Sequence, residues 1–136
     1  MATLNRKYPH LLPDDIAIWE RFLSAYEKRF NSFDYDVRVG LGRPADTSLP
    51  ENIQKAAIAL SQKRIDVVGH TDDAIMCIEI TGHAGLKAIG QLVAYPLLYA
   101  ETFKPTKPVL PLLVCAQLHP DVKPVLDSLK VPFYLV

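Results

Sequence analysis

The sequence predicts an α/β protein in which helices flank a mixed central sheet. Stretches with helical spacing alternate with short, β-branched apolar runs. Two neighbouring runs, residues 64–69 and 74–81, are separated by a polar turn and form a predicted hairpin. The C-terminal third then repeats strand, helix, strand, which implies right-handed crossovers and a largely parallel edge. With 136 residues, 49% of them hydrophobic, we expect one domain over residues 1–136 with a substantial core.

The N-terminal part is predicted to begin with a polar, mobile segment over residues 1–12. A helix follows, because Pro13 suits a first turn and the acids Asp14 and Asp15 are favoured there by the helix dipole. Its core-facing stripe consists of apolar residues at helical spacing: Ile16, Trp19, Phe22, Leu23, Tyr26 and Phe30. Residues 33–39 then alternate between apolar and polar side chains, which is the period of a half-exposed strand.

A second helix is predicted over residues 51–63, after a loop. Ser48 and Glu51 have the spacing of a capping box, in which each side chain satisfies a free backbone N–H of the first turn. The apolar face of this helix consists of Ile53, Ala56, Ala57 and Leu60.

The C-terminal half begins with a long helix over about residues 84–103, which Pro96 is expected to kink. Pro111 limits the next strand near its beginning, because proline cannot donate to a sheet ladder. The remaining elements are a strand, a short helix and a last strand, over residues 109–115, 121–130 and 131–136.

Composition excludes several classes of protein. Fifteen acidic and fifteen basic side chains cancel, so no strong overall field attracts nucleic acid.

Cys77 and Cys115 lie in apolar strand runs and are expected to be free, buried thiols in a reducing compartment. No apolar stretch reaches about 18 residues, so we expect a soluble, cytoplasmic protein without a membrane partner. Four C-terminal lysines are interpreted as scattered surface charges: Lys104, Lys107, Lys123 and Lys130.

The motifs of several enzyme classes are also missing. There is no Gly-x-Gly-x-x-Gly, P-loop or Gly-x-Ser-x-Gly pattern, which disfavours dinucleotide enzymes, NTPases and serine hydrolases. The four histidines lack the close spacing of a zinc site: His10, His70, His83 and His119.

Two carboxylates stand inside the apolar strands of the predicted hairpin, at Asp66 and Glu79. A two-residue turn at Asp72 and Asp73 places them directly opposite each other, with Cβ atoms about 5 Å apart. Like charges at that spacing repel, so a cation or a proton is required between them. Hard oxygen ligands in a partly open site favour Mg²⁺ or Mn²⁺, which also accept phosphate oxygens. The pair therefore indicates phosphodiester chemistry.

An alternative interpretation needs no metal. Asp66 would pair with Arg64 or Arg38, and Glu79 would pair with Lys87 in the same way. Such solvated ion pairs at strand ends have little energetic consequence.

Asp66, the run from Glu79 to Thr81, and Gln91 with Tyr95 on the next helix resemble the PD-(D/E)XK nuclease superfamily. The resemblance implies a restriction-endonuclease-like αβββαβ core, here with one inserted helix. It also implies that Asp66 and Glu79 bind the metal, with the carbonyl of Ile80 completing the shell.

The chain departs from the family at Thr81, where a lysine usually orients or activates the attacking water. A threonine hydroxyl donates a hydrogen bond but supplies no positive charge. Two residues are candidates to replace the lysine: His83 at the turn, and Lys87, which shares a helix face with Gln91.

Two functions are therefore predicted. The first is a Mg²⁺- or Mn²⁺-dependent DNA endonuclease or exonuclease, in which Thr81, Lys87 or Gln91 orients a metal-bound water. The second is a catalytically inactive nuclease-fold protein that serves in assembly, for example in the head or neck of a phage virion. Its partners would be other protein subunits, in a homo-oligomer or a viral assembly.

Overall fold

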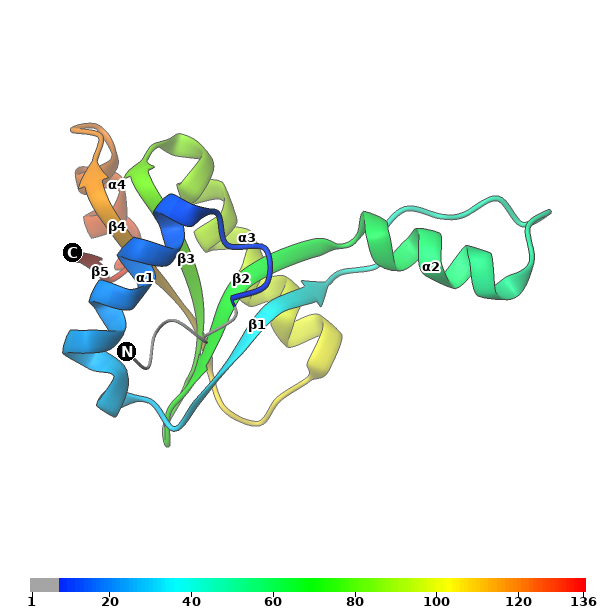
Figure 1. Cartoon of the computed structure of the whole chain (residues 1–136), viewed down its shortest axis with the longest axis horizontal. Coiled ribbons are helices and arrows are strands. Elements are labelled where there is room, and N and C mark those ends of the chain that lie inside the picture. The colour runs from blue at the N-terminus through cyan, green and yellow to red at the C-terminus, as the bar shows by residue number, and fades with distance from the viewer. Residues whose placement is uncertain (1–7) are drawn as a thin grey trace.

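The computed structural model describes residues 8–136 and contains the predicted alternation of helices and strands (Figure 1). The elements are, in order, α1 (Pro13–Tyr26), a short 3-10 helix (Glu27–Arg29), β1 (Ser32–Val39), α2 (Glu51–Ser61), β2 (Lys63–His70), β3 (Ile75–Ala84), α3 (Leu86–Phe103), β4 (Val109–Leu118), α4 (Val122–Leu129) and β5 (Phe133–Leu135).

The five strands form one mixed sheet in the order β1-β2-β3-β4-β5. The first three strands are antiparallel, whereas β4 pairs in parallel with both β3 and β5. In the β2–β3 hairpin, Val67 lies opposite Ile78. The N–H of Thr71 donates to the carbonyl of Ala74 at 3.0 Å, which closes a two-residue turn. The predicted hairpin register and the αβββαβ order with one inserted helix are confirmed.

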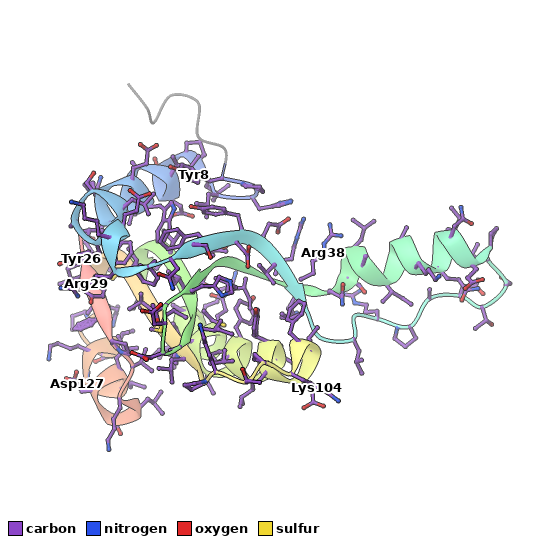
Figure 2. The ribbon with its side chains drawn as sticks, turned by 90° about the horizontal axis from the view of Figure 1, so that it is seen from below. Tyr8, Tyr26, Arg29, Arg38, Lys104 and Asp127 are labelled. Atoms are coloured by element: carbon purple, nitrogen blue, oxygen red, sulfur yellow. The ribbon has the colours of Figure 1, made fainter. Side chains whose placement is uncertain are left out.

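Helices cover both faces of the sheet, in three layers (Figure 2). Trp19 and Phe22 of α1 are fully buried against one face. On the other face, Leu92 of α3 and Leu126 of α4 pack against β4. Cys115 lies in this second core, and it is a free, buried thiol like Cys77, as predicted.

The segment before α1 is anchored to the core over its described part. Tyr8 and Leu11 are both buried and pack in the same cluster as Trp19. Within the segment predicted to be mobile, residues 8–12 thus lie against the core, and residues 1–7 lie outside the described residues.

Strands β1 and β2 change faces in the middle of the sheet. Tyr35 packs beneath α1, but Val37, two residues later, packs beneath α3. Asp36 between them has a φ of 55°, in the left-handed region that non-glycine residues seldom adopt. In β2, Ile65 packs on the α3 side and Val67 on the α1 side. The regular alternation predicted for residues 33–39 is thus broken at Asp36.

The insertion between β1 and β2 projects from the body as an arm, which we define as residues 40–62 (Figure 1). No residue of α2 is buried. At the base of the arm, the side-chain amide of Gln62 donates to the carbonyl of Gly40 at 2.7 Å. The N–H of Gly40 donates to Oγ1 of Thr102 on α3 at 3.0 Å. These bonds attach the arm to the body.

Two expectations about these elements are wrong. Ser48 does not cap α2, because its hydroxyl donates to Oδ1 of Asp46 at 2.8 Å and the N-cap position is Pro50. Strand β4 also continues through Pro111 to Leu118. Its neighbour β5 pairs with β4 only from Leu113 onward, so on that side Pro111 breaks no ladder.

Candidate functional site

The predicted site residues line one cleft of about 330 Å³ beside the ends of α1 and α3. The cleft brings together residues from β2, β3 and α3 that are far apart in the sequence. Every residue for which a catalytic or metal-binding role was predicted lies on its wall: Asp66, Glu79, Ile80, Thr81, Lys87 and Gln91. His83, the other candidate to replace the missing lysine, lines it too.

The cleft lies where the sheet divides. The β2–β3 ladder extends from His70 opposite Ile75 to Val67 opposite Ile78 and ends there. Beyond this point β2 continues with β1 toward the arm, while β3 continues beside β4 (Figure 1). The β1–β2 ladder also skips the position at which Asp36 would face Asp66. The divergence of the strands leaves room for polar side chains inside the sheet.

Asp66 and Glu79 are half-buried and hydrogen-bond to each other across this split. Burial and then the negative charge of Asp66 raise the pKa of Glu79 to about 9. Burial also raises the pKa of Asp66, but the N–H of Ile80 donates to its Oδ2 at 3.3 Å and opposes the rise. At neutral pH the protonated Glu79 therefore donates to the Asp66 carboxylate, and one proton separates the two groups.

The N-terminal half of α3 contributes the predicted polar face. The side-chain amide of Gln91 donates to the hydroxyl of Tyr95 at 3.4 Å. Lys87, one turn earlier, is exposed, and its positive charge lowers the pKa of Glu79 against the larger effect of burial. The hydroxyl of Thr81 donates to the carbonyl of His83 at 3.4 Å. Lys87 is thus a cation whose charge acts on Glu79.

The ion pairs of the alternative interpretation do not form. Among residues 8–136, no ion pair links Asp66 to Arg64 or Arg38, or Glu79 to Lys87. Instead, the guanidinium of Arg64 contacts Asp36, with Nε 2.8 Å from Oδ1 and a terminal nitrogen 3.0 Å from Oδ2. The Asp36 charge itself raises the pKa of Asp66.

Two further titratable residues of the cleft were missed by the sequence analysis. Asp15 of α1 lines it, and its charge raises the pKa of both Asp66 and Glu79. His10 lines it as well, with Nε2 2.9 Å from Oδ2 of Asp36. Asp15 was explained by the helix dipole alone, since nothing local in the sequence indicates where α1 docks on the sheet.

The donor set fits a hard cation that keeps much of its hydration. Within residues 8–136, no group of three His, Cys, Asp or Glu side chains is arranged to hold a metal ion. Two carboxylates and a backbone carbonyl are a sparse set of oxygen ligands, which suits Mg²⁺ because it retains several waters and takes phosphate oxygens. Such a cation would replace the proton that the raised pKa keeps on Glu79 beside Asp66.

Comparison with solved structures identifies the fold. An EndoMS–dsDNA complex matches with a TM-score of 0.54 and 19% identity, over 96% of this chain and 48% of that chain. A repair endonuclease from Pyrococcus abyssi matches with a TM-score of 0.51 and 16% identity, over 98% of this chain and 50% of that one. The chain spans about half the length of these structures. At these identities the likeness shows the fold alone, which is an α/β fold with helices on both faces of a mixed sheet.

The other comparisons add no relative. No family model matches the sequence, and no curated protein matches it. In the described part of the chain, no helix has the length and apolar character needed to cross a membrane.

Proposed function

We propose that this chain is a PD-(D/E)XK-type nuclease domain that cleaves DNA with Mg²⁺ or Mn²⁺. The observation that carries the proposal is the pair formed by Asp66 and Glu79, two half-buried carboxylates that hydrogen-bond where the sheet divides. Burying two carboxyl groups side by side costs desolvation free energy that a purely structural pair does not recover, whereas a divalent cation bound between them would neutralise both. The fold shared with two endonucleases, one of them solved in complex with double-stranded DNA, supports DNA as the substrate.

In this proposal Asp66 and Glu79 hold the metal ion together with the carbonyl of Ile80. The N–H of Ile80 points toward Asp66. In an extended antiparallel strand the N–H and C=O of one residue point to the same edge, so this carbonyl also points toward the gap left by β2. When bound, the metal supplies Lewis acidity and an acidified water for attack on the phosphate.

The neighbouring side chains orient and stabilise the reacting groups. Thr81 and Gln91 contribute uncharged hydrogen-bond donors at the edge of the cleft, suited to holding a water in line. Lys87 contributes the positive charge that the family obtains from the residue at the position of Thr81. A fixed cation stabilises the negative charge that develops on the phosphate during attack.

The test is cleavage of supercoiled and linear DNA by the purified protein in Mg²⁺ or Mn²⁺. Asp66→Ala and Glu79→Ala should each reduce cleavage by at least about 100-fold, because each removes a ligand of the reacting metal. Circular dichroism of both variants serves as the folding control, and Asp127→Ala on the exposed face of α4 is the matched carboxylate control.

Absence of cleavage in the wild type and in a folded Thr81→Lys variant would overturn the nuclease proposal. The assembly function would then be tested by measuring the mass of the protein in solution.

A further inference from the structure

The carboxylate cleft continues along α3 to the base of the arm. A second cleft adjoins it and shares two wall residues with it, Lys87 and Gln91. A third cleft shares Lys63 and Leu98 with the second and ends at Arg43. The three together form one furrow that leads from the carboxylate pair to the arm.

Outside the carboxylate cleft, the charged side chains of residues 8–136 that line the furrow are all positive. The second and third clefts are lined by three cations and, within the described residues, by no acidic side chain: Lys87, Lys63 and Arg43. Among residues 8–136, neither Lys63 nor Arg43 forms a side-chain ion pair with an acid. These two charges are therefore available to an anionic ligand.

The positive charge is a property of this region and not of the whole chain. Residues 37–64 contain five basic side chains and two acidic ones, although the chain as a whole has net charge +0. Figure 2 shows β1 and β2 passing over α3 toward the arm, with Arg38 at the arm's base. Of these five basic residues, Arg64 pairs with Asp36 and Lys55 with Glu51, whereas Arg43 and Lys63 line the furrow and contribute a local positive field there.

We propose that this furrow holds the sugar-phosphate backbone of the DNA substrate on one side of the bond that is cleaved. Lys63 and Arg43 contact phosphates toward the arm. Lys87 lies where the second cleft meets the carboxylate cleft. Tyr95, half-buried on the wall of the second cleft, faces the same ligand with an aromatic ring. The inference rests on the proposed nuclease function, because a nuclease would bind DNA at the carboxylate cleft, where the furrow begins.

A polynucleotide suits the furrow better than a protein partner does. Its lining is basic at intervals along its length, which matches a ligand with a regular series of negative charges. The same contacts predict that a DNA end lying short of the arm is bound more weakly than one that reaches it.

The test compares DNA binding in EDTA, where no metal-dependent cleavage occurs, for the wild type and for Arg43→Gln combined with Lys63→Gln. The matched control is Lys28→Gln combined with Lys130→Gln, which removes two exposed lysines outside the furrow. The furrow variant should bind a labelled duplex about 10-fold more weakly at low salt. The slope of log K against log salt concentration should fall by about 2, because each lost phosphate contact removes roughly 0.9.

The outcomes separate this inference from the proposed function. If the furrow variant binds DNA with unchanged affinity and salt dependence and still cuts DNA, the proposed binding furrow is wrong and the proposed nuclease function stands. If the furrow variant binds DNA more weakly but neither the wild type nor any variant cuts DNA, the furrow is supported as a DNA-binding surface and the proposed nuclease function is wrong. A wild type that binds no DNA at about 50 mM salt, or a variant that alters only the mass of the protein in solution, would also overturn the furrow.

Discussion

The backbone N–H of Ile80 donates to Oδ2 of Asp66 at 3.3 Å, although β2 and β3 no longer pair as a ladder at that point. The bond ties the β2 carboxylate to the strand that carries Glu79. It also favours the charged form of Asp66, so the proton of the pair resides on Glu79, whose pKa is raised to about 9. The two carboxyl groups are therefore distinct in charge while they are adjacent in space.

This difference predicts how stability depends on pH in the metal-free protein. The pKa of Glu79 is raised from 4.5 to about 9 in the folded state, so the folded protein binds a proton that the unfolded chain releases. Its stabilising effect is complete below pH 4.5 and is lost as the pH rises through about 9. We expect the melting temperature in EDTA to fall across this window.

Glu79→Gln is the control for that experiment, because its amide can donate to Asp66 at any pH. The variant should match the wild type at pH 5 and melt higher than it by at least about 10 °C at pH 9, because a pKa raised from 4.5 to about 9 makes deprotonation of Glu79 cost several kcal/mol. Identical pH profiles for the two proteins, measured by calorimetry, would show that Glu79 does not retain its proton.

Divalent metal should restore the stability that is lost at high pH. A cation that binds only the folded state raises the melting temperature by mass action. Because it must displace the proton on Glu79, millimolar Mg²⁺ or Mn²⁺ should raise the melting temperature by several degrees at pH 8 and by less at pH 6. Asp66→Asn should abolish the shift and Asp127→Asn should not. An equal shift in both variants would assign the metal to another site.

Lys87 is predicted to replace the family's missing lysine, since its charge reaches Glu79. Lys87→Met should lower the single-turnover cleavage rate by about 10- to 100-fold, because it removes a cation beside the reacting phosphate. His83→Ala should change that rate by less than about 3-fold, since a partly solvated group at the cleft edge contributes little. Rescue of Lys87→Met by Thr81→Lys would establish that the two positions supply the same charge. Lack of rescue, with both variants folded, would contradict this.

The sequence predicted the hairpin because local features determine it. A two-residue turn and alternating apolar positions fix the register, and the register brings Asp66 and Glu79 together. The docking of α1 depends on packing between distant segments, so Asp15 could not be placed in the cleft from its neighbours in the chain. The break in β1 at Asp36 was not predicted for a different reason, because the uninterrupted alternation of side chains in the sequence conceals the positive φ of 55° there.

Asp36 and Arg64 provide the last prediction, which concerns how the split in the sheet is maintained. The Asp36 side chain is 15% exposed, and its Oδ1 lies 2.8 Å from Nε of Arg64, in an ion pair whose angle falls outside hydrogen-bond geometry. Arg64→Met would leave the Asp36 carboxylate without its guanidinium and beside Asp66, whose pKa its charge already raises. We expect a loss of about 1–3 kcal/mol in the free energy of unfolding. Metal binding should shift to higher pH, because Asp66 becomes harder to ionise. Asp36→Asn in the same protein should recover most of both effects, since it removes the charge that has lost its guanidinium partner. A double variant no better than Arg64→Met, in urea unfolding and in metal titration, would show that Arg64 acts through packing and not through the charge of Asp36.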